Sequence, residues 1–307
     1  MDLISRMQAA FPLSRVEIEQ MIQTAPWRYK VHFIEKRNGR GRRLIAQPTA
    51  EIKLVQRWIV ETYLSQLPVH SAAMAYRANK SIKDHAAIHA SNKYLLKLDF
   101  ENFFPSILAR DFQIHIVRYA EVSILDAKAL SRLLFRIDRE SKVMSLSIGA
   151  PSSPCISNTI MYSFDSLVAA YCEKLDIRYS RYADDLAFST NVPHLLDAVK
   201  KFVQETCRAS THPSLNLNEA KTVFTSKKFQ RQLTGLVLTN EGRVSMGRER
   251  KREIRAIAHK FMQGKLNQEE QNRLRGLIAF ALHVEPEFVN SIRRMIGSEA
   301  YSTLMKG

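Results

Sequence analysis

The sequence predicts an α+β fold, in which strands from distant parts of the chain join one sheet and a helical region follows. Residues 93–100 and residues 178–189 are rich in β-prone side chains, with long helical patterns between and after them. Residues 247–281 are almost wholly helical and basic, with a break expected at Gly264. The chain has 307 residues, of which 45% are hydrophobic, so it can fill one large core or two linked ones.

The N-terminal helices are predicted from local signals. Residues 14–24 form an amphipathic pattern that begins at Ser14, with Glu17 three positions later, the spacing of a capping box. A second helix is predicted over residues 51–67 and ends before Pro68. Both helices carry an apolar face, and we expect these faces to pack against the core.

A β-hairpin is predicted between these two helices. Residues 29–34 and 43–46 flank Asn38-Gly39-Arg40-Gly41, which is turn-prone and very basic. Further along the chain, helices are predicted over residues 124–137 and 157–175.

The net charge of +16 is concentrated in two segments. Residues 28–57 hold nine Lys or Arg against two acids, and residues 221–275 hold fourteen against five. Residues 58–220 are nearly balanced, with 18 basic and 17 acidic side chains. This division suits a nucleic-acid enzyme whose basic arms neutralise phosphates while its centre keeps carboxylates free for a metal ion. A helix-rich protein with solvated basic faces is the alternative.

Several classes of protein are excluded or disfavoured by composition. No apolar run reaches the roughly 18 to 20 residues that cross a bilayer, and the first eleven residues lack the apolar core of a signal peptide. We therefore expect a cytoplasmic protein with no membrane partner. Cys155, Cys172 and Cys207 lie too far apart for a CxxC metal clamp, and we expect buried thiols.

Three carboxylates stand out as candidates for chemistry. Asp184 and Asp185 are adjacent at the centre of a strand-turn-strand pattern, where both can turn toward one cation. Asp99 ends an apolar strand 85 positions earlier, where an ionised acid needs a positive partner. Magnesium suits such a set, because it takes few protein oxygens and leaves positions to water and substrate phosphates. For an isolated pair of aspartates, a polar turn without function is the alternative.

Three motifs in this order resemble those of reverse transcriptases. They are Asp99-Phe-Glu-Asn-Phe-Phe-Pro-Ser, Gly149-Ala-Pro-Ser-Ser-Pro154 and Tyr182-Ala-Asp-Asp185. The chain is most similar to the bacterial retron enzymes, from about Arg28 to the C-terminus. That family has an Asn-Ala-x-x-His element, where this chain reads His85-Ala-Ala-Ile-His89, and a Val-Thr-Gly triplet, where it reads Leu233-Thr234-Gly235.

The resemblance implies a right-hand polymerase with an antiparallel palm sheet and a helical thumb. Its regions would be an N-terminal helix and fingers over residues 1–92, a palm with inserted fingers elements over 93–244, and the thumb over 245–307. Such an enzyme makes DNA from RNA. It would use deoxynucleoside triphosphates and two magnesium ions held by Asp99, Asp184 and Asp185, with the Phe100 carbonyl contributing.

The resemblance also assigns roles around the substrate. Phe104 would be the steric gate against the ribose 2′-hydroxyl, and Gly149 with Ala150 would support the incoming nucleotide. Lys221 would be a general acid for the pyrophosphate leaving group. Arg43 would clamp the triphosphate, with a plain surface arginine as the alternative. The family usually has Gln before the glycine, whereas this chain has Ile148, which leaves no amide for substrate or template.

A further set of residues would hold RNA or the primer. His85 and His89 would be a structural or RNA-contacting element, and a shared metal ion is disfavoured because no third ligand lies nearby. The remaining candidates are the triplet and the basic residues of the predicted thumb helix: Leu233, Thr234, Gly235, Arg248, Arg250, Lys251, Arg252 and Arg255. A solvated helix face with internal ion pairs is the alternative for the basic residues.

Retron resemblance implies a dedicated structured RNA as template, priming from an internal 2′-hydroxyl, and DNA that stays joined to RNA. It also implies a role in defence against phage with a separate effector protein. The alternatives are a reverse transcriptase of the group II intron or diversity-generating type, and a non-catalytic RNA-binding scaffold of the same fold. Tyr76, Trp58 and Trp27 are expected to pack in the core or the hairpin.

Overall fold

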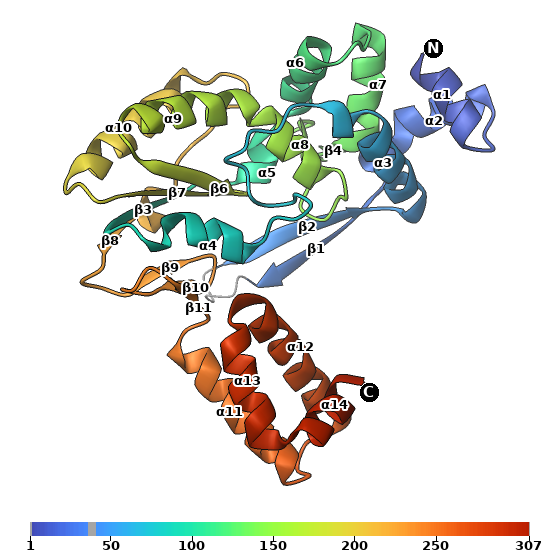
Figure 1. Cartoon of the computed structure of the whole chain (residues 1–307). Helices are drawn as coiled ribbons and strands as arrows, with labels where there is room; N and C mark the ends of the chain where they lie inside the picture. The colour runs from blue at the N-terminus through green and yellow to red at the C-terminus, as the bar shows by residue number, and fades with distance from the viewer. Residues whose placement is uncertain (1, 36–40, 307) are drawn as a thin grey trace.

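The structure is a computed structural model that describes residues 2–35 and 41–306. A central antiparallel sheet has the strand order β6-β7-β3-β8, and a separate bundle of four helices ends the chain (Figure 1). The predicted α+β order is confirmed, because the sheet joins strands from residues 94–99 with strands from residues 178–226.

The N-terminal region contains the predicted helix and hairpin. Helix α1 (Leu3–Ala10) precedes α2 (Arg15–Thr24), which begins at Ser14 with the complete capping box to Glu17. After the short helix η1 (Ala25–Trp27), strands β1 (Tyr29–Glu35) and β2 (Arg42–Pro48) pair in antiparallel register. The expected turn at 38–41 lies outside the described residues except for Gly41.

The helix predicted over residues 51–67 is shorter than expected. Helix α3 (Ala50–Thr62) ends at Tyr63, and η2 (Leu64–Gln66) takes up the last turn before Pro68. The Thr62 hydroxyl donates to the Trp58 carbonyl, a local bond that β-hydroxyl residues make at the end of a helix. The prediction was therefore correct in type and wrong in length.

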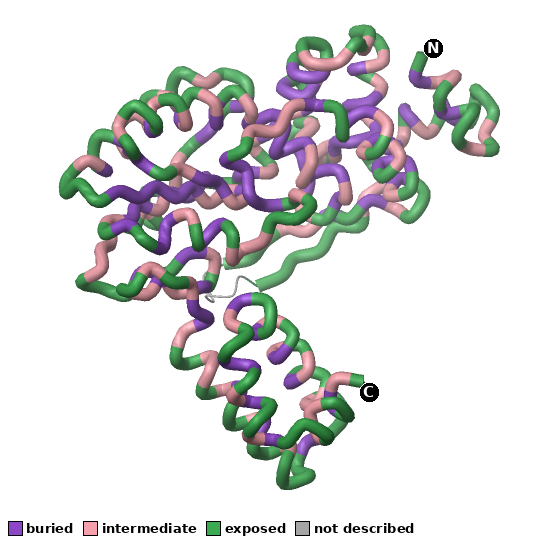
Figure 2. The backbone as a smooth tube through the Cα atoms, in the orientation of Figure 1, coloured by how far each residue is buried: buried purple, intermediate pink, exposed green. Residues whose placement is uncertain are grey.

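Helix α4 (Ile82–Ala90) covers one face of the central sheet and α9 (Tyr162–Lys174) with α10 (Leu195–Ala209) cover the other (Figure 1). The sheet consists of β3 (Tyr94–Asp99), β6 (Arg178–Tyr182), β7 (Asp185–Thr190) and β8 (Val223–Ser226). Because helices cover both faces, much of the sheet is buried (Figure 2). In the central strand β7, every residue from Leu186 to Thr190 is buried, the polar Ser189 and Thr190 included.

Further helices pack around the sheet, and two predicted spans are divided. Residues 124–137 form α7 (Ile124–Leu134) and the short strand β4 (Arg136–Ile137), which pairs with β5 (Met144–Ser145). Residues 157–175 belong to α8 (Ser153–Ile160) and α9, with a break at Met161 that no Gly or Pro marks. The short α5 (Phe103–Ser106), α6 (Ala109–Tyr119) and η3 (Glu219–Lys221) complete this region.

The C-terminal bundle has its own hydrophobic core. A small sheet of β9 (Arg231–Leu233), β10 (Leu236–Leu238) and β11 (Val244–Ser245) leads into it. The bundle comprises α11 (Arg248–Met262), α12 (Gln268–Val284), α13 (Pro286–Ile296) and α14 (Ser298–Lys306). Gly264, with a φ of +66°, breaks the helical run as predicted. None of the helices in the described ranges is long and apolar enough to span a bilayer.

Buried histidines tie α4 to the central sheet. The two ring nitrogens of His89 lie 2.8 Å from Ser189 Oγ and 2.7 Å from Ser180 Oγ, and His85 Nδ1 lies 2.9 Å from the same Ser180 oxygen. Burial lowers the pKa of His85 to about 4 and lowers that of His89 well below its usual value. Both rings therefore stay neutral in the folded protein under mildly acidic conditions.

We predict that His85 makes the protein less stable in mild acid. In the unfolded chain His85 takes up a proton near pH 6.5, whereas in the native state it does so only near pH 4. The contribution of neutral His85 to the free energy of unfolding is therefore complete above pH 6.5 and is lost as the pH falls toward 4. Urea unfolding at pH 7.5 and 5.5 should show that wild type loses about 1 kcal/mol more than His85→Asn over this interval. Equal losses in the two proteins would contradict a neutral buried His85.

Candidate active site

The three aspartates meet at one end of the central sheet. Strand β3 pairs with β7 so that Asp99 lies directly opposite Asp185. Asp184 precedes Asp185 in the tight turn that joins β6 to β7, and its carbonyl accepts a hydrogen bond from the Phe100 amide at 3.1 Å. Residues separated by 85 positions thus share one site, as their sequence context predicted.

The site is electrostatically crowded. Burial, followed by the charges of Asp184 and Asp99, raises the pKa of Asp185 to about 7. Burial and the Asp99 charge also raise the pKa of Asp184, against the opposing charges of Lys221 and Arg43. Three carboxylates at this spacing need positive charge beside them before all of them can ionise.

Lys221 supplies one such charge. It ends η3 and places its ammonium nitrogen 2.8 and 3.0 Å from the two Asp99 carboxylate oxygens. The segment that carries it is held to β3, because the Asn218 amide donates to the Asp99 carbonyl at 2.8 Å. Partial burial opposes the shift, but the hydrogen bond to Asp99 and the three carboxylate charges raise the pKa of Lys221.

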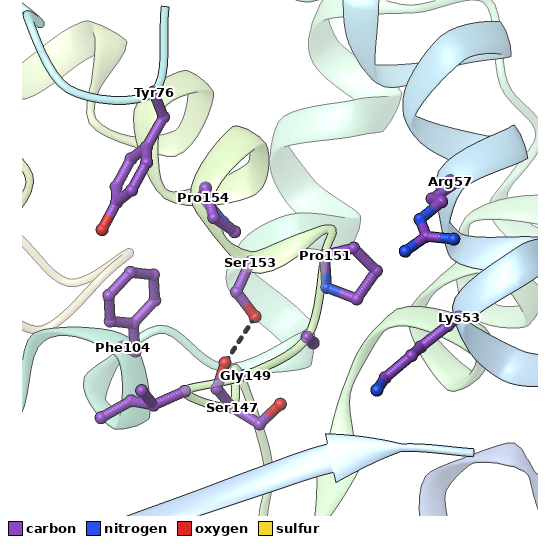
Figure 3. Close-up of a pocket in the computed structure, with 11 residues that line it drawn as sticks. Lys53, Arg57, Tyr76, Phe104, Ser147, Gly149, Pro151, Ser153 and Pro154 are labelled. Carbon is purple, nitrogen blue, oxygen red and sulfur yellow. Dashed lines mark hydrogen bonds between the residues drawn. The ribbon is translucent and has the colours of Figure 1, made fainter. Parts of the chain in front are cut away.

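A cavity of about 350 Å³ opens beside the chain between Ser147 and Pro154. Phe104 and Tyr76 line it on one side of the loop, while Lys53 and Arg57 face the loop from α3 (Figure 3). The Ser153 hydroxyl donates to the Ser147 carbonyl at 2.7 Å and closes the loop. Gly149 and Ala150, both predicted nucleotide contacts, are part of the lining.

Gly149 lies against strand β2. Its φ is +114°, and a Cβ there would meet Ala46 O at 3.3 Å, Ile45 Cγ2 at 3.2 Å and Gln47 Cγ at 3.1 Å. The Ile148 carbonyl accepts from the Ala46 amide at 2.9 Å. Ile148 stands where the family usually has a glutamine. Its backbone carbonyl holds the loop to the hairpin.

Arg43 belongs to the same face of the hairpin as Ile45 and Gln47, since side chains two apart on a strand point the same way. That face is turned toward the Gly149 loop. The positive charge of Arg43 acts on both Asp184 and Tyr76 and opposes the rise in pKa that burial causes in each. Arg43 therefore lies within electrostatic reach of the carboxylates.

Sequence reasoning missed several residues of this region. Tyr76 was expected to pack in the core or the hairpin, but it is 53% exposed and lines the cavity with Phe104. Lys53 and Arg57 lie four positions apart on the exposed side of a predicted helix, and that spacing was the available signal. The other two aromatic residues behave differently: Trp58 packs against Phe11 and Tyr63, whereas Trp27 is exposed beneath Lys142.

His85 and His89 are fully buried, so their side chains are not exposed on the surface of the protein. Of the two interpretations left open for them, the structural one agrees with their contacts to the sheet. Leu233 is buried as well, and Thr234 and Gly235 form the turn from β9 to β10 with φ values of +47° and +79°. Gly235 is exposed and lines a groove with Lys227, Lys228 and Arg248.

The five residues of α11 that were predicted to contact RNA have different surroundings. Arg248, Arg252 and Arg255 are exposed. Lys251 is engaged inside the bundle, with its ammonium 2.5 Å from a Glu285 carboxylate oxygen. Arg250 lies over the Phe280 ring at 5.1 Å. Part of the predicted RNA-contacting set therefore also stabilises the bundle.

The carboxylate oxygens of the site are suitable ligands for a divalent cation, although the side chains are not gathered around one point. In residues 2–35 and 41–306 no three His, Cys, Asp or Glu side chains are gathered into a metal-holding group. However, the Lys221 ammonium bonds both oxygens of Asp99, and burial together with the charges of Asp184 and Asp99 raises the pKa of Asp185. Hard carboxylate oxygens around a position that attracts a cation are the ligands that magnesium prefers.

The fold and the site together define a polymerase. The family model described as "Reverse transcriptase (RNA-dependent DNA polymerase)" matches residues 34–255. Among solved structures, apo telomerase from Candida tropicalis aligns with a TM-score of 0.52 and 11% identity, over 87% of this chain and 57% of that one. The α+β architecture is that of a right-hand polymerase.

Similar curated proteins narrow the family. Retron Ec83 reverse transcriptase of Escherichia coli is 39% identical over 99% of this chain and 97% of that protein. Retron Ec86 reverse transcriptase, also from E. coli, is 31% identical over 96% of this chain and 88% of its own length. The chain belongs to the retron reverse transcriptases. It is an RNA-directed DNA polymerase that uses an RNA template and deoxynucleoside triphosphates, in a family that works with divalent metal ions.

We predict that Gly149→Ala impairs polymerisation by displacing the loop or β2. The added Cβ meets Ala46 O at 3.3 Å in a backbone conformation that L-residues rarely adopt. Misplacement of the loop that lines the cavity should lower kcat/KM by roughly 10- to 100-fold. Gly264→Ala is the matched control, because Gly264 also has a positive φ but has open space around its Cβ position. Equal activity of the two variants would contradict the tight contact.

Proposed function

We propose that Asp99, Asp184 and Asp185 are the catalytic carboxylates of this polymerase and hold two magnesium ions. The observation that carries the proposal is the register of β3 against β7, which pairs Asp99 with Asp185 beside the turn that contains Asp184. The Phe100 backbone lies next to that turn, which supports a contribution from its carbonyl. When bound, the ions would neutralise charge that develops on the transferring phosphoryl group.

The reaction is attack of a primer hydroxyl on the α-phosphate of a deoxynucleoside triphosphate. Alignment and electrostatic stabilisation supply most of the acceleration in phosphoryl transfer, so the residues need to be positioned before substrate arrives. Lys221 is protonated and beside Asp99, which supports its role as the proton donor to the departing pyrophosphate.

The cavity beside the aspartates would receive the incoming nucleotide. Phe104, the proposed gate against the 2′-hydroxyl, lines this cavity together with Gly149 and Ala150, which supports their proposed contacts with the nucleotide. Arg43 lies within reach of both Asp184 and Tyr76, which supports a contact between its guanidinium and the triphosphate.

The regional division follows the same scheme. We assign fingers to residues 1–92, palm with inserted fingers elements to 93–244, and thumb to 245–307, and the separate core of the last four helices supports the final boundary. The exposed arginines of α11 and the groove of about 810 Å³ at its start would hold the template-primer duplex by its phosphates. A hybrid duplex suits such a grip by shape.

The substrate would be a cognate structured RNA, copied into multicopy single-stranded DNA that stays joined to RNA after priming from an internal 2′-hydroxyl. The similarity to retron enzymes over nearly the full chain supports this assignment. It also supports a role in antiphage defence together with a separate effector protein. The intron and diversity-generating alternatives lack such support, and the presence of all three aspartates disfavours a non-catalytic scaffold.

We predict that Asp185→Asn abolishes DNA synthesis on the cognate RNA. Loss of one electrostatic contact to a transition state costs on the order of 100-fold or more in kcat, and Asp185 lies at the centre of the carboxylate group. Primer extension with Asp197→Asn is the control, because Asp197 is an exposed carboxylate on α10. An Asp185→Asn enzyme as active as this control would contradict the assignment.

The product of the same assay tests the retron substrate. After ribonuclease digestion, the wild-type DNA should keep a ribonucleotide attached through a 2′-linkage, and a free 5′ end would contradict internal priming. In cells that carry the complete locus, Asp185→Asn should restore phage plaques, whereas unchanged protection would contradict the defence role.

We predict that Arg248→Ala combined with Arg252→Ala weakens the salt dependence of RNA affinity. Each lost phosphate contact should lower the slope of log affinity against log salt by about 0.7 to 0.9. Lys201→Ala with Arg208→Ala removes the same charge from the exposed surface of α10 and is the control. A slope that falls equally in both double variants would refute phosphate contact at α11.

A further inference from the structure

The catalytic turn adopts a backbone conformation that needs support. Ala183, the first of the two residues between the paired Tyr182 and Asp185, has a φ of +56°. Glycine usually fills a hairpin position of this kind, and an alanine stays there only if the surrounding structure holds it. The support reaches the turn from the strand that leads into it.

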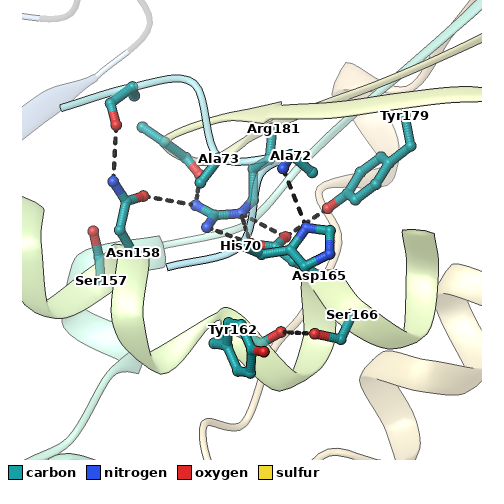
Figure 4. Close-up of polar contacts among 12 residues, drawn as sticks. His70, Ala72, Ala73, Ser157, Asn158, Tyr162, Asp165, Ser166, Tyr179 and Arg181 are labelled. Atoms are coloured by element: carbon teal, nitrogen blue, oxygen red, sulfur yellow. Dashed lines mark hydrogen bonds and ion pairs between the residues drawn. The ribbon is translucent and has the colours of Figure 1, made fainter. Parts of the chain in front are cut away.

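Arg181 holds the turn from inside the protein. Its side chain is completely buried, and its Nη1 donates to the Ala183 carbonyl at 2.9 Å. Nη2 donates to Asp165 Oδ2 at 2.7 Å and Nε to Asp165 Oδ1 at 2.9 Å, so the guanidinium is clamped by one buried carboxylate on α9 (Figure 4). A two-point clamp fixes the plane of the guanidinium as well as its position.

The same guanidinium is also connected to the segment that carries Tyr76. Arg181 Nη1 also lies 3.4 Å from Asn158 Oδ1, and Asn158 Nδ2 donates to the Ala75 carbonyl at 2.8 Å. Ala75 precedes Tyr76, which lines the cavity and has a φ of +60°. The backbones are joined too, because the Met74 amide donates to the Arg181 carbonyl and the Arg181 amide to the Ala72 carbonyl, each at 2.8 Å.

We propose that Arg181 is a positioning residue for polymerisation, because it fixes the Ala183-Asp184 turn and, through Asn158, the Tyr76 wall of the nucleotide cavity. This inference rests on the proposed roles of Asp184 and Asp185. Arg181 contacts the turn directly, and Asn158 connects Arg181 to the segment that carries Tyr76.

The test separates the two links by their kinetic effects. Arg181→Lys keeps a positive charge beside Asp165 but cannot make the two-point clamp together with the bonds to Ala183 and Asn158. We expect kcat to fall by about 10-fold or more and KM for the nucleotide to rise as well, because both links are weakened. Asn158→Ala releases the Tyr76 segment and should raise that KM by about 10-fold with kcat nearly unchanged.

Tyr179→Phe is the matched control. The Tyr179 hydroxyl donates to Asp165 Oδ1 at 2.7 Å, in the same buried cluster, and within the described residues it makes no hydrogen bond to the turn or to the Tyr76 segment. It should lower the melting temperature and leave kcat and KM unchanged. Hydrogen exchange in the free protein is a second readout: exchange over residues 72–77 and 182–186 should rise in Arg181→Lys and stay at the wild-type level in Tyr179→Phe.

The proposal is overturned if activity in all three variants falls in proportion to melting temperature, or if folded Arg181→Lys keeps the wild-type kcat. Should Arg181→Lys fail to fold, Arg181→Met with Asp165→Leu replaces the pair by apolar side chains, an exchange that other buried ion pairs tolerate. Its kcat is expected to fall in the same way, and a wild-type kcat would overturn the proposal. Asp185→Asn is measured in parallel. An active Asp185→Asn enzyme would show that the site assignment itself is wrong, whereas an inactive one confines a negative result to the role of Arg181.

Discussion

The organisation of the molecule depends on one strand register, the pairing of β3 with β7 that places Asp99 opposite Asp185. A shift of either strand by one residue would turn its aspartate to the other face of the sheet and separate the carboxylates. The register brings negative charge together in a partly buried place, where it is stable only beside positive charge. Lys221 and Arg43 supply positive charge beside these carboxylates.

The distribution of charge along the chain has a counterpart in space. The basic N-terminal segment forms the β1–β2 hairpin, whose one face meets the Gly149 loop, and the basic C-terminal segment begins the helical bundle (Figure 1). The electrically balanced middle forms the sheet that carries the acids. Positive charge thus flanks the carboxylates from two directions, as an enzyme acting on a polyanion requires.

Features with local causes could be predicted from the sequence. The capping box at Ser14, the hairpin strands, the break at Gly264 and the strand that ends at Asp99 depend on neighbouring residues, and all of them are present. Features that depend on distant contacts could not be predicted. The early end of α3 and the break at Met161 have no Gly or Pro signal, and the burial of His85 and His89 depends on serines about 90 to 100 positions away.

The candidate site shows the same division. The motif around each aspartate indicated the carboxylates, whereas Tyr76, Lys53, Arg57 and Arg181 were missed because their roles arise only when separate segments meet. Arg181 illustrates the reason most clearly. A charged residue in a strand is usually a surface residue, and only its contacts with Asp165 and Ala183 reveal why this one is buried.

The central claim is that these three aspartates form the metal-binding centre of the polymerase. It is tested most directly by an experimental structure with a template-primer that lacks its terminal 3′-hydroxyl, an incoming deoxynucleoside triphosphate and magnesium. The account predicts two ions bound by Asp99, Asp184 and Asp185, with the triphosphate in the cavity beside Phe104 and Gly149. Ions bound elsewhere, with the Lys221 ammonium still on both Asp99 oxygens and no metal near Asp185, would contradict it.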